Sequence, residues 1–131
     1  MPLARLSIGD VVHIGAGQSS SIVTVSNSEV TFVRTLIIHA ASIESTTPDA
    51  PIYVQIYVVP NDNGNVGVAT AGHRIARLNL AANDTFFVEP EYPIILDSNN
   101  DTLQVLNEGT NYFGASNAPI NVLAMGDREV P

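Results

Sequence analysis

The sequence predicts an all-β protein, a two-sheet antiparallel sandwich of the jelly-roll type with about eight strands. Short runs rich in Val, Ile, Thr and aromatic residues recur at a spacing of roughly 8–15 residues, and clusters of Gly, Pro, Asn, Asp and Ser separate them. No stretch keeps apolar residues at helical spacing for about three turns without a Pro, a Gly or a β-branched cluster. We therefore expect very little helix.

The first part of the chain contains the longest expected strand. The pattern of residues 3–14 predicts strand structure interrupted by a turn, and this strand structure ends at the Gly- and Ser-rich segment 15–20. Residues 21–25 form a short β-rich run. After the turn cluster at 26–28, the segment 30–40 is dense in β-branched residues, which pack well on a pleated surface. This segment predicts one long strand.

The segment 52–59 has the clearest strand pattern, because aliphatic residues occupy every even position. We expect this aliphatic face to be part of the core. Tyr53 and Tyr57 then fall on the outer face of the same strand. Tyrosine is frequent at protein interfaces, since it combines apolar area with a hydroxyl group.

The rest of the chain continues the pattern of short strands. Five more strands are expected after a surface loop at 60–67, and they cover residues 74–80, 85–89, 94–96, 102–106 and 120–125. Pro90 and Pro93 confine the piece between the second and third of these strands to a sheet edge. Most of the segment 107–119 is expected to be loop.

The length of 131 residues suits a single domain with a real core. We expect residues 21–131 to form one β-sandwich domain. Residues 1–20 are expected to be either an N-terminal arm that reaches a neighbouring subunit or the first strand of the sandwich. The sequence has no cysteine, so disulfides and thiolate metal sites are excluded and stability must come from packing.

The start of the sequence lacks the apolar segment of a secretory signal, and no run approaches the roughly 18 apolar residues of a membrane span. We therefore expect synthesis in a cytoplasm and no membrane partner. The formal net charge is −8 and all five basic residues are arginine. Nucleic acid is not an expected partner, because phosphate binding needs clustered Lys and Arg.

Charged residues make up 14% of the sequence, against about 25% in average soluble domains. A small monomer usually covers much of its surface with charge. Two interpretations fit this composition: part of the surface is buried between subunits, or the protein is a neutral polar β-protein. We favour the first, a homo-oligomer.

No pattern of catalytic or metal-binding residues is present. His13, His39 and His73 lie in different segments and have no metal-ligand spacing, and there is no Gly-x-Ser-x-Gly motif. The loops 61–65 and 97–101 are rich in Asn and Asp but lack the order and the closing Glu of a calcium loop. We expect no enzyme activity, no metal and no cofactor.

Between residues 30 and 106 the order of features resembles that of a group of small virion structural proteins of tailed bacteriophages. The features that carry the resemblance are the segments 31–39, 54–60, 74–85, 93–96 and 101–105. The resemblance implies a role in assembly, and among the roles of such proteins we favour capsid decoration. A decoration, or cement, protein sits on the outer capsid surface and bridges capsid subunits, which suits a negative charge without lysine.

Three functions therefore stay open. The first is decoration of the phage head by a homo-oligomer, for which we favour a trimer. Its partner would be the major capsid protein or another virion protein, and it would be made in the host cytoplasm. The second is a neck, tail or fibre-attachment module. The third is a carbohydrate- or receptor-binding sandwich, in which an exposed tyrosine would stack on sugars. The tyrosines considered for that role are Tyr53, Tyr57, Tyr92 and Tyr112.

For the assembly role we expect outward-facing tyrosines to be buried between subunits and arginines to pair with carboxylates of a neighbouring copy. The candidate interface residues are Arg34, Tyr53, Tyr57, Arg77, Glu89, Glu91 and Tyr92.

Overall fold

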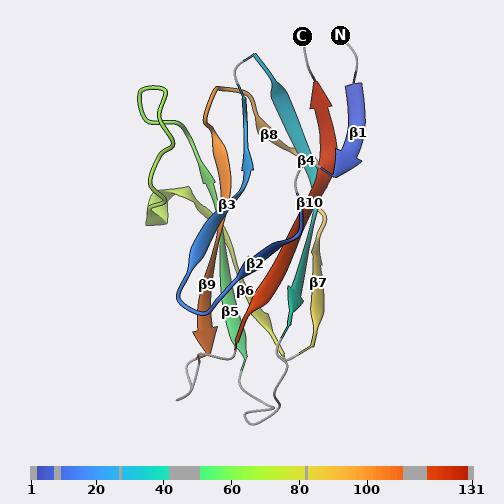
Figure 1. The fold of residues 1–131 in the computed structure, drawn as a ribbon, viewed down its shortest axis with the longest axis vertical. Helices are drawn as coiled ribbons and strands as arrows, with labels where there is room; N and C mark the ends of the chain where they lie inside the picture. Colours follow the sequence, from blue (N-terminus) through green and yellow to red (C-terminus); the bar gives the residue numbers. More distant parts are fainter. Residues whose placement is uncertain are drawn as a thin grey trace.

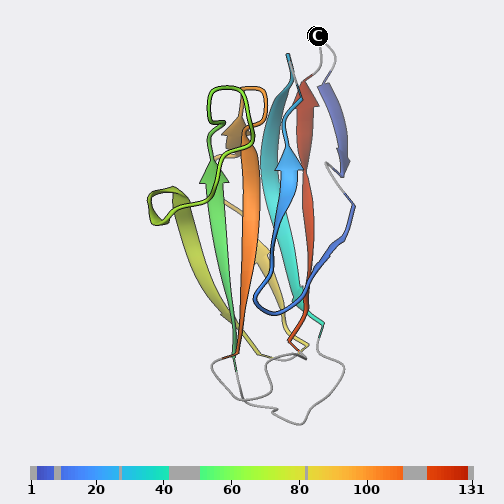
Figure 2. The same ribbon diagram turned by 60° about the vertical axis from the view of Figure 1, so that its left-hand side comes forward.

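Two antiparallel sheets pack face to face and form a sandwich (Figures 1 and 2). The computed structural model describes residues 3–7, 10–26, 28–41, 51–81, 83–110 and 118–129. These residues contain ten strands: β1 (Leu3–Ser7), β2 (Val12–Ile14), β3 (Ser19–Thr24), β4 (Val30–Ala40), β5 (Ile52–Val59), β6 (Arg74–Leu80), β7 (Thr85–Val88), β8 (Ile94–Leu96), β9 (Thr102–Thr110) and β10 (Ile120–Glu129). The predicted two-sheet antiparallel sandwich is confirmed.

The larger sheet has six strands and the smaller has four. The order in the larger sheet is β1-β10-β4-β7, with β2 also paired to β10 and β8 also paired to β4. The order in the smaller sheet is β3-β9-β5-β6. Since β1 and β2 share one edge of β10, and β7 and β8 share one edge of β4, each pair acts as one interrupted edge strand. The ten strands thus fill eight positions, the number that a jelly roll requires.

Helix is nearly absent, as the sequence predicts. The structure describes one turn of 3₁₀ helix, η1 (Ala71–His73), immediately before β6. No helix in the described part of the chain has the length and apolar character of a membrane span.

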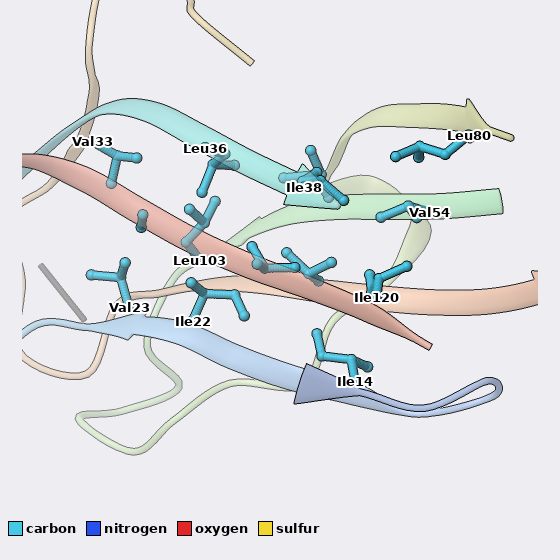
Figure 3. Close-up of a cluster of buried hydrophobic side chains, with 14 of the residues drawn as sticks. Ile14, Ile22, Val23, Val33, Leu36, Ile38, Val54, Leu80, Leu103 and Ile120 are labelled. Atoms are coloured by element: carbon cyan, nitrogen blue, oxygen red, sulfur yellow. The ribbon is translucent and has the colours of Figure 1, made fainter. Parts of the chain in front are cut away.

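The core lies between the inner faces of the two sheets. In β5, Ile52, Val54 and Ile56 are fully buried, as predicted for the aliphatic face of this strand. Val58, predicted on the same face, is half-buried, and Val59 is fully buried instead. Figure 3 shows Val33, Leu36 and Ile38 of β4 pointing toward side chains of the opposite sheet, Leu103 of β9 among them. The described part of the core is made of Ile, Leu, Val and Ala alone.

Residues near the N-terminus lie within the six-stranded sheet. β1 pairs with the end of β10, Leu3 lying opposite Glu129, and β2 pairs with its start, Ile14 lying opposite Ile120. The Ile14 side chain is buried in the core (Figure 3). In this single chain residues 3–7 and 12–14 are edge strands of the chain's own sheet.

The buried side chain of Asn107 fastens β2 to the rest of the sandwich. Its Nδ2 donates to the carbonyl of Ile14 at 3.0 Å and to that of Ala118 at 2.7 Å. Its Oδ1 accepts from the backbone N–H of Gly109 at 2.7 Å. A buried amide is tolerated here because its donor and acceptor groups both have partners.

A β-bulge interrupts the pairing of β4 with β10. Thr35 lies opposite Met125 and Val33 lies opposite Gly126, so Arg34 is the extra residue. The two backbones approach closely at this bulge. A Cβ atom on Gly126 would lie 1.9 Å from the carbonyl oxygen of Phe32, which no side chain can do without moving the backbone.

Gly126→Ala is therefore expected to lower the free energy of unfolding by about 3 kcal/mol, the upper end of the usual cost of overpacking. Urea unfolding followed by circular dichroism measures it. Gly72→Ala is the control, because the nearest atom to its Cβ would be Thr70 Oγ1 at 3.7 Å, and a change within about 0.5 kcal/mol is expected. Equal unfolding midpoints for both variants would contradict the close approach of β10 to β4.

Candidate functional site

The outer face of the six-stranded sheet carries a group of exposed apolar side chains. Phe87, Ile95 and Met125 are 56%, 54% and 42% exposed. The half-buried side chains of Ile37 and Leu123 lie between them, since Ile37 is opposite both Leu123 and Phe87. Phe32, also half-buried, lies opposite Ile95. We call these six residues the apolar face.

Polar groups border the apolar face at both ends. At one end His39 Nδ1 is 2.9 Å from Thr85 Oγ1, and His13 Nδ1 is 2.8 Å from Asn121 Oδ1. At the other end the Arg34 guanidinium pairs with the buried carboxylate of Asp127. An apolar centre with a polar rim is the usual anatomy of a protein–protein interface.

The outer face of the four-stranded sheet carries a polar network instead. The carboxylate of Glu108 accepts from Arg77 Nε at 2.8 Å, from Arg77 Nη2 at 3.2 Å and from Gln55 Nε2 at 2.8 Å. The hydroxyl of Tyr57 donates to Gln55 Oε1, and the Arg77 guanidinium lies 4.4 Å from the centre of the Tyr53 ring. We call these five residues the polar network.

The polar network shifts the pKa values of its two charged members. The hydrogen bond from Arg77 holds the pKa of the Glu108 carboxyl below its ordinary value, burial opposes this shift, and the hydrogen bond from Gln55 adds to it. The same hydrogen bond to Glu108 raises the pKa of Arg77. Both shifts favour the charged pair, so the network is held together at neutral pH.

A cleft of about 360 Å³ lies beside the polar network. It is lined on the sheet side by residues of β3, β5 and β9 and on the other side by the segment 66–69 that precedes η1. The side-chain amide of Gln104 donates to the carbonyl of Gly67 at 3.1 Å and so joins the sheet to this segment.

The seven residues predicted to form an interface do not share one surface. Tyr53, Tyr57 and Arg77 lie together on the four-stranded sheet, whereas Arg34 lies on the six-stranded sheet. The remaining three, Glu89, Glu91 and Tyr92, are exposed in the connection between β7 and β8. Arg34 and Arg77 each pair with a carboxylate of the same chain, so their pairing with Glu89 or Glu91 across a subunit boundary stays a prediction. Tyr112 lies outside the described residues.

The sequence interpretation missed the apolar face. The signal was present, because the segments 30–40 and 120–125 carry apolar residues at both odd and even positions. A strand of that kind is typical of a sheet that is covered on both sides.

The two loops that are similar to calcium loops in composition lie side by side and bind each other. Asp101 Oδ1 accepts from the backbone N–H of Asn61 at 2.8 Å, and Asp101 Oδ2 accepts from that of Ser98 at 3.1 Å. Asn100 Nδ2 donates to the carbonyl of Gly64 at 2.7 Å. The Asn and Asp side chains of the two loops therefore serve to form the turns and to join them, which explains why these loops are rich in both residues. Among the described residues, no three His, Cys, Asp or Glu side chains are grouped as metal ligands.

The fold belongs to the class of jelly-roll β-sandwiches. No family model and no curated protein matches the sequence. A chain in the structure of infectious bursal disease virus, Gx strain, matches 98% of this chain with a TM-score of 0.54 and 10% identity. A chain in the crystal structure of the infectious bursal disease virus VP2 subviral particle matches 97% of it with a TM-score of 0.38 and 9% identity.

This protein covers 32% and 31% of those two viral chains, so it spans about a third of their length. At 10% identity the first match shows a shared fold. That structure is not of a tailed bacteriophage protein, so the resemblance to that family stays a prediction for everything beyond the sandwich fold.

The lowered pKa of Glu108 predicts how stability depends on pH. The ionised carboxylate stabilises the fold above the ordinary pKa of 4.5, and this contribution is lost as pH falls through the lower pKa of the folded state. Glu108→Gln is therefore expected to be less stable than the wild type at pH 7 and to approach it in strongly acidic solution. Urea unfolding midpoints measured from pH 7 down to pH 2 test this.

The matched control is Glu91→Gln. Glu91 is exposed and has no hydrogen bond or ion pair within the described part of the chain. Its variant should follow the wild-type pH profile. A Glu108→Gln profile parallel to the wild type over the whole range would contradict a stabilising role of the Glu108 charge.

Proposed function

We propose that this protein is a non-catalytic virion structural protein that decorates the outer capsid surface and bridges neighbouring capsid subunits. The observation that carries the proposal is the apolar face of the six-stranded sheet. A sandwich exposed to water on both sides alternates apolar inward and polar outward residues. Here β4 and β10 break that rule on the same face and side by side, which favours burial of this face by another protein.

The energetics favour burial of this face. Its two phenylalanines are large, since an aromatic side chain buries about 150–250 Å² when it is fully covered. Phe87 and Ile95 are each more than half exposed in the single chain, and they extend the face onto β7 and β8. Apolar area removed from water contributes about 25 cal/mol per Å² before the costs of association.

Two further observations support a virion role. The fold is similar to that of about a third of a chain in a virus structure. The charged fraction of 14% is low for a small protein that is exposed on all sides. The net charge of −8 without lysine suits a surface that faces solvent rather than packaged nucleic acid. In this proposal the protein is made in the host cytoplasm and assembles on the particle as a homo-oligomer, with a trimer favoured.

The apolar face is expected to hold the oligomer or the capsid contact together. Phe87→Glu and Ile95→Glu each place a carboxylate in the contact, and either change is expected to raise the dissociation constant about 30-fold or more. Ile75→Glu is the matched control, because Ile75 is 52% exposed but lies on β6 of the other sheet. Native mass at low micromolar concentration, measured by light scattering, compares the three variants with the wild type.

A wild-type trimer that Phe87→Glu dissociates and Ile75→Glu leaves intact is the expected result. A ring of six or twelve copies would instead indicate the alternative position in a neck or tail. Equal effects of the Phe87 and Ile75 variants would contradict the role of the apolar face.

The decoration role itself is tested on particles. Particles without the protein are expected to release their genome at a lower temperature, and addition of the wild-type protein should restore the higher one. Phe87→Glu should fail to restore it and Ile75→Glu should succeed. Particles of unchanged thermal stability after removal of the protein would overturn the decoration role even if the oligomer is real.

A further inference from the structure

We propose that the cleft on the four-stranded sheet binds a neutral saccharide. This inference does not depend on the virion role, because it concerns the opposite face of the sandwich from the apolar face. Its evidence is the chemistry of the lining. The residues that line the cleft are Ser19, Ser21, Tyr57, Val66, Gly67, Val68, Ala69, Gln104, Val105 and Leu106.

None of the lining side chains is charged. A phosphate, a carboxylate or an ammonium group would lose its hydration in this cleft without gaining an ion pair, which is costly. The lining therefore selects an uncharged ligand.

The lining combines hydrogen-bonding groups with apolar surface. Ser19, Ser21 and Tyr57 supply hydroxyls from the sheet side. The two serine hydroxyls can donate and accept, whereas the Tyr57 oxygen, whose proton is donated to Gln55, can accept. Val66 and Val68 supply apolar surface from the facing segment, and Val68 is 82% exposed. A sugar ring has the matching chemistry, since its hydroxyls lie around the edge and its C–H groups form apolar patches on its faces.

Two of the hydrogen-bonding groups, on Tyr57 and Gln104, are fixed before a ligand arrives. The Tyr57 hydroxyl is bound to Gln55, which Glu108 holds in turn. The amide nitrogen of Gln104 is engaged by Gly67 and by Thr102 Oγ1, at 3.1 Å and 2.9 Å, which leaves the amide oxygen as an acceptor. Groups that are already oriented lose little entropy on binding.

The apolar side of the cleft is fixed as well. A Cβ on Gly67 would lie 2.5 Å from the carbonyl oxygen of Pro60, so the segment is packed tightly against the end of β5. Asp62 and Asn65 exchange two backbone hydrogen bonds of 2.7 Å and 2.9 Å, which close the preceding turn. The cleft therefore has two firm sides, and its volume of about 360 Å³ lies at the small end of ligand sites.

The test is a titration of the full-length protein with the methyl glycosides of glucose, galactose, mannose and N-acetylglucosamine, followed by ¹H–¹⁵N chemical shifts. At least one glycoside is expected to bind with a dissociation constant of about 1 mM and to shift the Gln104 side-chain amide and the amides of residues 66–69. Tyr57→Ala should weaken binding about tenfold, the effect of losing one oriented contact. Ser21→Trp, which fills the cleft from β3, should abolish it.

Tyr92→Ala is the control, because Tyr92 is 78% exposed and does not line the cleft. Ser21→Trp keeps the test decisive if Tyr57→Ala unfolds, since position 21 is exposed on β3. Binding that survives Ser21→Trp, or that is lost equally in Tyr92→Ala, overturns the proposal. So does the absence of binding by all four glycosides, or binding of sialyl-lactose and heparin disaccharides alone.

Discussion

The pairing of β4 with β10 is the interaction on which the rest of the sandwich depends. The ladder runs from Ala40 opposite Ile120 to Val30 opposite Glu129, nearly the full length of both strands. Every other strand of the six-stranded sheet pairs with one of these two strands. Both strands carry apolar side chains on both faces. One face closes the core against β5 and β9, and the other forms the apolar face, so fold and proposed assembly share one pair of strands.

The edges of the six-stranded sheet are built differently from its centre. Each edge consists of two short strands, β1 with β2 and β7 with β8, of three to five residues each. Short and interrupted edges are poor templates for strand addition. Association by extending this sheet is therefore disfavoured, and association through its face is favoured. The short strand β2 has few backbone hydrogen bonds to β10. The side chain of Asn107 compensates for this, because it binds the carbonyl of Ile14 at the end of β2 and that of Ala118.

Two kinds of strand could be predicted from the sequence. One is a strand that buries a single face, because its apolar residues alternate, and the other is a long segment rich in apolar β-branched residues. The alternation in 52–59 predicted the burial of Ile52, Val54 and Ile56 and the outward direction of Tyr53 and Tyr57, but it failed at the end of β5, where Val59 is fully buried in place of Val58. The expected strand 30–40 coincides with β4. The functional surfaces were harder to predict, because they join residues distant in sequence. Ile37 meets Phe87 only through the pairing of β4 with β7, and Glu108 meets Arg77 only where β5 lies between β9 and β6.

The two outer faces differ in chemistry, and this difference permits both proposed roles in one small domain. An apolar face gains from permanent burial, whereas a polar network of half-buried tyrosines and an exposed arginine remains satisfied in water. If the six-stranded sheet is covered, the four-stranded sheet and its cleft point away from the covered contact. A site that binds a single sugar weakly becomes effective when many copies are held on one particle, because each further contact is then intramolecular. Assembly through one face would thus supply the multivalency that a weak cleft on the other face requires.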